Sequence, residues 1–152
     1  MTEVLGFDFR PELYYNSDHV WLKRESDGTV KVGFDDIVAK GSHEIFFLKL
    51  LDAGTAIVQK KKLGVIESRK YSGPIVSSIS GTIITVNPVI LKDGPFGFME
   101  SPYDKGWLLA IKPSNVEADI KNLMQGDSAL DWFRKAAEPL QDELELFKKK
   151  HA

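Results

Sequence analysis

Short runs of hydrophobic positions, separated by polar and turn residues, extend from about residue 19 to residue 112. Within Thr29–Phe34 the hydrophobic side chains take alternate positions, which predicts a β-strand with one buried face. Asp27-Gly28 stands directly before this strand and predicts a hairpin turn from an earlier strand at Val20–Leu22. Residues 1–18 are polar and aromatic and are expected to form a loop.

Further short runs, several of them rich in β-branched residues, predict the rest of a β body. The apolar run 45–51 is dense enough for a strand that is buried on both faces. Asp93-Gly94-Pro95 predicts the start of a Gly/Pro-rich loop. Many short strands at regular spacing are typical of a compact β sandwich or barrel. The expected strands cover residues 45–51, 55–58, 63–66, 75–76, 82–86 and 107–111.

The pattern changes after Pro113, where helical spacing replaces the short strands. Ser114-Asn115-Val116-Glu117 has the S-x-x-E form of a capping box, which satisfies free backbone amides at the start of a helix. We expect this helix to reach about Gln125 and to be closed by Gly126.

A second, longer helix is expected to begin at Asp127 or Ser128 and to be kinked or divided at Pro139. Apolar side chains recur along it at intervals of three and four residues, which places them on one helical face. This face is expected to pack on the β body rather than on a partner. Its members are Leu130, Phe133, Ala137, Leu140, Leu144 and Phe147.

Composition bounds the class of protein. The 152 residues are 43% hydrophobic and 28% charged, which suits one globular domain over 1–152, with a β body at about 19–112 and a helical extension at about 114–150. A net charge of −2 gives no electrostatic argument for a nucleic-acid partner. No apolar run is long enough to cross a bilayer, so no membrane partner is expected. The cysteine-free chain is consistent with a cytoplasmic location.

Residue types that commonly perform catalysis or hold metals form no recognisable group. The three histidines are far apart in the sequence, so no metal site is expected. Motifs for a nucleophilic serine, a phosphate loop or a dinucleotide site are absent, so no catalytic residue is expected. We expect Asp35-Asp36 to lie on a solvated turn, because adjacent residues of a strand point to opposite faces.

One lysine stands between two expected strands. The segment Gly64–Tyr71 would present Lys70 at a hairpin-like tip, where a modifying ligase can reach its amine. This arrangement alone is weak evidence for modification, because most surface lysines simply interact with solvent.

Three segments around this lysine match the motifs of one family in order and with preserved spacing. The family's run G-I-T-D…G-D-I-V-F-V-E-L-P-E-V-G corresponds without gaps to Gly33–Gly54, and its S-P-V-S-G-E-V-V-E-V-N corresponds to Ser77–Asn87. Over residues 19–112 the chain therefore resembles the H protein of the glycine cleavage system. The G-x-V-E-S-V-K segment matches Gly64, Glu67, Ser68 and Lys70, and, after one inserted residue, D-P-Y-G-E-G-W matches Pro102, Tyr103, Gly106 and Trp107.

This resemblance implies a mainly β protein, a lipoyl/biotinyl-type β sandwich (barrel-sandwich hybrid) with C-terminal α-helices. It also implies a carrier without catalysis of its own, in which lipoate is bound as lipoamide to Lys70 and carries an aminomethyl intermediate. Glu67 and Ser68 are implied to help set the hairpin and its recognition by the ligase. The implied partners are glycine decarboxylase, aminomethyltransferase, dihydrolipoamide dehydrogenase and lipoate ligase.

The chain departs from the family pattern near the implied arm. The family's H-E-W is His19-Val20-Trp21 here, so a glutamate associated with the aminomethyl-loaded arm is replaced by valine. Tyr71 follows Lys70 where the family has a small residue. Lys60, within Lys60-Lys61-Lys62, replaces the glycine of the usual turn before the lipoyl hairpin. The three lysines are expected to form a solvated turn rather than a docking patch.

Three alternatives follow from these residues. The H-V-W and K-aromatic-x-G-P combination resembles H-like lipoate-binding proteins, which carry sulfur intermediates for a heterodisulfide-reductase-like complex in sulfur oxidation. A biotin carrier on the same fold is disfavoured, because Arg69 and Tyr71 flank the lysine where biotin domains typically have methionines. An unmodified interaction module would keep the fold and bind a partner through its helical tail.

Overall fold

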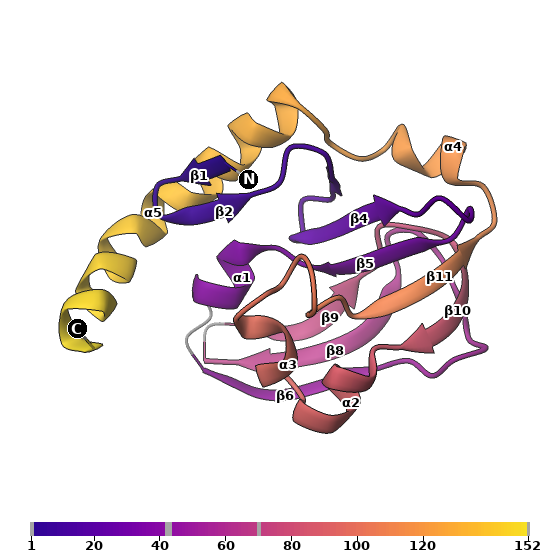
Figure 1. Cartoon of the computed structure of the whole chain (residues 1–152), viewed down its shortest axis with the longest axis horizontal. Coiled ribbons are helices and arrows are strands. Elements are labelled where there is room, and N and C mark those ends of the chain that lie inside the picture. Colours follow the sequence, from indigo (N-terminus) through magenta and orange to yellow (C-terminus); the bar gives the residue numbers. More distant parts are fainter. Residues whose placement is uncertain (1, 42–43, 70, 152) are drawn as a thin grey trace.

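The structure is a computed structural model that describes residues 2–41, 44–69 and 71–151 (Figure 1). Strands dominate up to Pro113 and helices dominate after it, as the hydrophobic pattern predicts. The strands are β1 (Thr2–Val4), β2 (Phe7–Phe9), β3 (Tyr14–Tyr15), β4 (Val20–Arg24), β5 (Val30–Phe34), β6 (Ile45–Leu50), β7 (Ala56–Ile57), β8 (Lys62–Ser68), β9 (Ser72–Val76), β10 (Gly81–Val86) and β11 (Leu109–Pro113). The helices are α1 (Asp36–Gly41), α2 (Pro88–Asp93), α3 (Phe96–Met99), α4 (Val116–Ile120) and α5 (Asp127–His151).

Two sheets form the β body. One has the strand order β3-β4-β5-β11-β10-β7, and the other has the order β6-β8-β9. All neighbouring strands in these sheets are antiparallel. The β4–β5 hairpin turns at Gly28, whose φ of +89° is readily adopted by glycine. The sheets lie in two layers (Figure 1), which confirms the predicted β sandwich.

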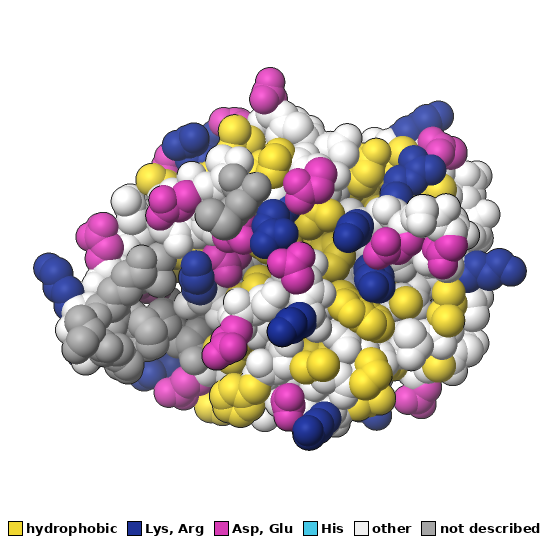
Figure 2. All heavy atoms as spheres, in the orientation of Figure 1, with side chains coloured by type: hydrophobic (Ala, Val, Ile, Leu, Met, Phe, Trp, Pro, Cys, Tyr) yellow, Lys and Arg dark blue, Asp and Glu magenta, His cyan; other side chains and the backbone are white. Residues whose placement is uncertain are grey.

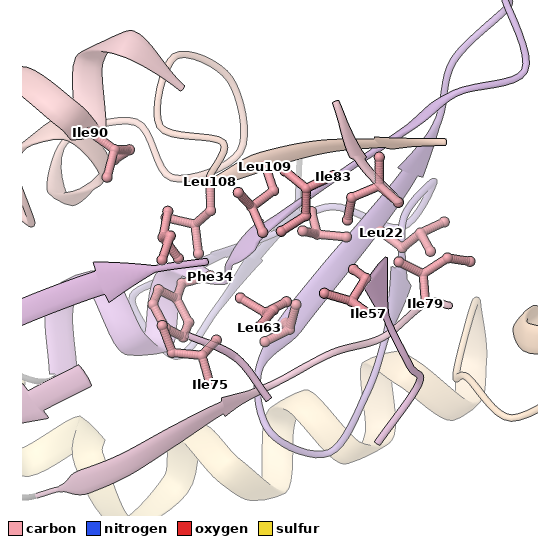
Figure 3. Close-up of a cluster of buried hydrophobic side chains, with 14 of the residues drawn as sticks. Leu22, Phe34, Ile57, Leu63, Ile75, Ile79, Ile83, Ile90, Leu108 and Leu109 are labelled. Atoms are coloured by element: carbon pink, nitrogen blue, oxygen red, sulfur yellow. The ribbon is translucent and has the colours of Figure 1, made fainter. Parts of the chain in front are cut away.

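The main hydrophobic core fills the space between these two layers. Leu22, Phe34 and Leu109 point into it from the larger sheet, and Leu63 and Ile75 point into it from the smaller sheet (Figure 3). Each of these side chains is almost completely buried. Burying one large aliphatic side chain stabilises the fold by about 1.5–3 kcal/mol, so the alternating pattern of the strands provides much of the stability of the scaffold.

Strand β6 differs from its prediction. The side chains of Phe46 and Phe47 are 65% and 47% exposed, so the strand is not buried on both faces. β6 is an edge strand of the smaller sheet, and a bulge between Ile45 and Phe47 interrupts its pairing with β8. Because a bulge breaks the alternation of inward and outward positions, two consecutive phenylalanines both reach solvent.

A second core lies on the outer face of β4. Trp21 is fully buried there, and its indole N–H donates to the carbonyls of Phe34, at 2.8 Å, and Pro102, at 3.2 Å. Gly33 pairs with Trp21 across the two strands, and a Cβ at Gly33 would come within 2.6 Å of the indole ring. The glycine therefore makes room for the buried tryptophan.

The N-terminal segment forms a hairpin where a loop was expected. β1 and β2 pair antiparallel, and the turn between them uses Leu5 and Gly6, with φ of +51° and +91°. Phe7 and Phe9 are buried in the second core. Their alternation was a usable strand signal, because both point to the same face of β2.

Helix α5 covers the second core and is one continuous element with Pro139 inside it, so the proline does not divide the helix. Figure 1 shows the helix running across the N-terminal hairpin. Phe133 and Ala137 are fully buried, which confirms that the apolar face packs on the body. The side chains of Leu144 and Phe147 lie outside the described residues. No helix in the described part of the chain is long and apolar enough to span a membrane.

Two short helices occupy the region predicted to contain a Gly/Pro-rich loop. Asn87 caps α2, and its side-chain oxygen accepts a hydrogen bond from the Val89 amide at 3.0 Å. Pro88 takes the first helical position, where its missing N–H costs nothing. α2 ends at Gly94, whose φ is +59°, and α3 begins two residues later.

Helix α4 is shorter than predicted. Its cap is Asn115 rather than Ser114, because the Asn115 side chain accepts from the Ala118 amide at 3.2 Å. The helix ends at Ile120, and the segment that follows pairs with Tyr15 through Met124 instead of continuing the helix.

Lys60 and Lys61 lie in an exposed turn, as expected, and Lys62 is the exposed first residue of β8. The turn is fixed by two backbone bonds: the Lys60 amide donates to the Ser77 carbonyl at 2.9 Å, and the Ser77 amide donates to the Lys61 carbonyl at 2.8 Å. Lys60 has a φ of +73°. A side chain in this left-handed region meets steric resistance that glycine avoids.

We expect Lys60→Gly to raise the free energy of unfolding by about 0.5–1 kcal/mol, because relief of the left-handed strain exceeds the added entropy of the unfolded chain. Urea denaturation of the two proteins measures the change. Lys61→Gly is the matched control: its φ is not positive, so that variant should not be more stable than the wild type. Equal effects of the two substitutions would contradict the assignment of strain to Lys60.

Candidate functional site: a hairpin tip and the pocket beside it

A tight turn joins β8 to β9 and contains position 70. The Ser68 amide donates to the Tyr71 carbonyl at 2.7 Å, and the Ser68 hydroxyl donates to the same carbonyl at 3.0 Å. Ser68 Oγ also accepts from the Tyr71 amide at 3.1 Å. Lys70 itself lies outside the described residues. The bonds between Ser68 and Tyr71 bring the end of β8 and the start of the β9 segment together.

The residues next to the turn anchor it on both sides. The Tyr71 hydroxyl donates to the Pro74 carbonyl at 2.9 Å, so the ring folds back along β9. A Cβ at Gly73 would come within 2.9 Å of that hydroxyl oxygen, which makes glycine suitable there. On the other side, the Arg69 amide donates to the Glu44 carbonyl at 2.9 Å. The tip is therefore short and held by the body.

A pocket of about 300 Å³ opens beside this hairpin. Ser68 and Tyr71 contribute to one wall, and the turn that contains His19 contributes to another. Most of the remaining lining is apolar and includes Ile37 of α1 and Leu140 of α5. The pocket thus joins the hairpin tip, the β body and the C-terminal helix in one mainly apolar site.

The turn before β4 sets His19 at the pocket wall. The Asn16 side-chain oxygen accepts from the amides of Asp18, at 3.0 Å, and Val20, at 2.9 Å. The Asn16 side-chain nitrogen donates to the Val76 carbonyl at 3.0 Å, which ties the turn to β9. His19 has a φ of +67°, an uncommon conformation for a residue other than glycine. The backbone is therefore constrained at the residue that faces the pocket.

Asp35 holds the His19 ring in place. Its Oδ2 lies 2.6 Å from His19 Nδ1, and its Oδ1 accepts from the Val38 amide at 3.1 Å, which caps α1. The Trp132 ring of α5 lies against the histidine, with 4.9 Å between ring centroids. The Asp35 side chain is fully buried, and the His19 side chain is 24% exposed. The imidazole is thus enclosed by a carboxylate and an aromatic ring.

The expectation of a solvated turn at Asp35-Asp36 is wrong, because both residues are buried. The Asp36 carboxylate accepts from the Asp8 amide at 2.7 Å and forms an ion pair with Lys40 at 2.9 Å. The backbone amide of Asp36 donates to the Tyr103 hydroxyl at 3.1 Å. β5 ends directly before this pair, so the rule for adjacent residues of a strand does not apply. Both carboxylates are buried because each has specific partners.

The environment of His19 favours its protonated form. Burial by itself would lower the pKa of the imidazole, but the charge of Asp35 and the hydrogen bond to it act in the opposite direction. Asp18 adds a smaller attraction. Together they raise the pKa of His19 above its usual value.

We expect this pair to make stability depend on pH. Because the pKa of His19 is higher in the folded than in the unfolded chain, protonation favours the folded state. This contribution is fully present below the unfolded pKa of about 6.5 and is lost as the pH rises through the folded pKa. Chemical denaturation measures the free energy of unfolding at pH values from 5 to 9. Between these limits the free energy of unfolding should fall more for the wild type than for His19→Gln. Parallel curves for the two proteins would contradict the prediction.

Of the other residues that the sequence analysis singled out, some lie at the pocket and others do not. Ser68 contributes to the pocket, whereas Glu67 is exposed on β8 and is not among the described residues that line the pocket. Val20 is fully buried in the main core, so the position of the family's glutamate presents no carboxylate here. Asp18 instead lines the pocket and is exposed. The sequence analysis missed the pairing of His19 with Asp35. A signal was available, because Asp35 stands where the quoted family motif has threonine.

Comparisons with known proteins agree with this fold. The sequence model of the family described as "Glycine cleavage H-protein" matches residues 13–136. The glycine cleavage system H protein of Teredinibacter turnerae is 37% identical over 109 residues, which cover 72% of this chain and 83% of that protein. Glycine cleavage system H protein 2 of Aquifex aeolicus is 32% identical over 139 residues, covering 91% and 86%.

A solved structure shows the same fold. The crystal structure of a glycine cleavage system H protein from Mycobacterium marinum superposes with a TM-score of 0.67 at 23% sequence identity, and covers 86% of this chain and 98% of that one. The two-layer body therefore has the fold of a lipoyl-type β sandwich. The chain belongs to the glycine cleavage H-protein family. Members of this family carry lipoate covalently on a lysine.

Proposed function

We propose that this chain is a lipoyl carrier with its arm attached to Lys70, and that the arm passes an aminomethyl group between the enzymes of glycine cleavage. The observation that carries the proposal is the closed turn between Ser68 and Tyr71, the described residues on either side of positions 69 and 70, at the end of a β-hairpin beside a pocket. Family membership supplies the chemical identity of the arm.

The pocket suits a lipoyl group in size and chemistry. Its volume of about 300 Å³ and mainly apolar lining match an aliphatic chain that ends in a sulfur ring. Ile66, Ile75 and Leu140 provide apolar surface, and Ser68 and Tyr71 connect that surface to the hairpin tip. When bound, the group would supply a dithiol that this cysteine-free chain lacks. The protein would present the arm and raise its local concentration near a docked enzyme.

Asp18 supports an aminomethyl cargo. A loaded aminomethyl amine is cationic, and Asp18 places an exposed carboxylate on the lining of the pocket. This carboxylate lies two residues before Val20, where the family has its glutamate. We therefore propose that Asp18 provides the counter-charge that Val20 lacks, and that glycine decarboxylase, aminomethyltransferase and dihydrolipoamide dehydrogenase are the partners.

A second candidate function is favoured by one observation. Val20 is fully buried in the main core and leaves no carboxylate at the position associated with the aminomethyl-loaded arm. An uncharged sulfur intermediate does not need that carboxylate. The same arm on Lys70 would then carry sulfur for a heterodisulfide-reductase-like complex.

Intact-mass measurement tests the carrier function. After incubation with lipoate ligase, ATP and lipoate, the wild-type chain should gain one lipoyl group, and peptide mapping should place that group on Lys70. A chain that stays unmodified while a control H protein in the same reaction is fully modified would refute the proposal. It would then leave the interaction module as the remaining alternative.

Reconstitution separates the two cargoes. The lipoylated protein, mixed with glycine decarboxylase and aminomethyltransferase, should support glycine-dependent exchange of carbon dioxide, and Asp18→Asn should weaken this activity. No exchange by the fully lipoylated wild type would reject the glycine cargo and favour the sulfur cargo.

A further inference from the structure

An acid–base pair, to which the carrier function assigns no role, lies at the wall of the pocket. His19 lines the pocket, and its Nδ1 is occupied by Asp35 at 2.6 Å. Its Nε2 has no hydrogen-bond partner among the described residues. The carboxylate is fully buried, so the pair is a built feature of the interior rather than a chance surface contact.

Three elements fix the ring orientation. Asp35 is itself held by the Val38 amide of α1, the His19 backbone is held by the turn at Asn16, and Trp132 of α5 covers one side of the ring. An imidazole whose Nδ1 binds a carboxylate presents its other nitrogen for proton exchange. This arrangement, a histidine oriented by a buried aspartate, activates thiol and hydroxyl groups in many proteins.

We propose that His19, oriented by Asp35, is the proton-holding group of the pocket and stabilises the thiolate form of the reduced arm. This inference rests on the proposed lipoylation of Lys70. His19 takes one proton from a thiol at Nε2, and the sulfur keeps the electron pair of the broken S–H bond. Asp35 balances the charge of the resulting imidazolium through the Nδ1–H bond. No electron is transferred, so no oxidant or reductant is needed.

Other charged residues lie on the elements that pack around His19 and Asp35. Asp18 lies on its own turn and lines the pocket, so its negative charge opposes thiolate formation. On α5, Asp131 and Lys135 neutralise each other at 3.1 Å and are exposed to solvent. On α1, Lys40 is engaged by Asp36. His19 is therefore the cation through which the described side chains of the pocket can favour a thiolate.

The absence of cysteine makes this inference directly measurable, because the only thiols of the reduced carrier are those of the arm. The fully lipoylated protein is reduced, and its alkylation rate with iodoacetamide is followed by intact mass from pH 5.5 to 9.5. The midpoint of the rate profile reports the thiol pKa. We expect the wild-type midpoint to lie about one unit below that of His19→Gln, which is about a tenfold difference in thiolate at low pH.

Two further variants separate activation from simple packing. Asp35→Thr introduces the residue of the family motif, keeps an oxygen that can cap α1, and removes the charge behind His19. Its midpoint should rise towards that of His19→Gln. Asp18→Asn is the matched control in the same pocket, and its midpoint should fall or stay unchanged because a negative charge is removed. Circular dichroism confirms that each variant is folded.

The outcomes are distinct. Equal midpoints for lipoylated wild type, His19→Gln and Asp35→Thr would overturn the role of His19 while leaving the carrier function intact. If the midpoint of Asp18→Asn rose as much as that of His19→Gln, the role of His19 would also be overturned, because a general disturbance of the pocket would then explain both results. A chain that accepts no lipoyl group gives no alkylation at all, which overturns the carrier function and this inference together.

Discussion

Lys70→Arg should abolish lipoyl addition completely. Arginine keeps the positive charge and the length of the side chain, but its guanidinium stays protonated and is not a nucleophile for the activated lipoyl group. The turn itself is closed by Ser68 and Tyr71, so the substitution should leave the hairpin folded. Intact mass after incubation with lipoate ligase, ATP and lipoate measures the effect, which we expect to be all or none.

Lys61→Arg is the matched control for this experiment. Lys61 is an exposed lysine directly before β8, whereas position 70 follows β8 in the sequence. This variant should accept one lipoyl group at the wild-type rate. Modification of Lys70→Arg to the same extent as the control would show that the arm is attached elsewhere.

Phe133→Ala should lower the free energy of unfolding by about 3–5 kcal/mol. The Phe133 ring is fully buried in the second core, where its centroid lies 5.1 Å from Phe9 and 6.3 Å from Tyr15. Truncation removes these contacts and leaves a cavity between α5 and the N-terminal hairpin. Because folded domains are stable by only about 5–15 kcal/mol, this single change would remove a large part of the total.

Leu146→Ala on the same helix is the control, because that side chain is 60% exposed. It should change the free energy of unfolding by less than about 0.5 kcal/mol. Urea denaturation of the three proteins provides the comparison. A similar small loss for both variants would show that α5 contributes little to the stability of the body.

The sequence predicted the β body well because alternation is a local property. Thr29–Phe34 carries its inward pattern within six positions, and Asp27-Gly28 marks the turn before it. Whether both faces of a strand are buried is not determined by the local sequence. The run 45–51 is apolar enough for an interior strand, yet β6 lies at a sheet edge, and only the pairing of distant strands decides that.

The candidate site was predictable in part, and for a similar reason. The position of a turn between β8 and β9 follows from the short runs on either side of it. The burial of Asp35 and Asp36 depends on His19, Tyr103 and the amide of Asp8, which lie far away in the sequence. Spacing within the chain cannot reveal such partners. Alternation at Phe7 and Phe9, by contrast, was a local signal of β2 that the sequence analysis did not use.

The N-terminal hairpin and α5 belong to the same buried cluster as Trp21, and this has a consequence for how the protein is made. The sandwich can assemble once residue 113 is available, but the cover over the outer face of β4 needs α5, which a ribosome synthesises after the strands. Until then, the rings of Phe9 and Tyr15 lack the contact that Phe133 of α5 provides. A nascent chain halted before residue 127 should therefore be a ligand for chaperones that recognise exposed aromatic surface.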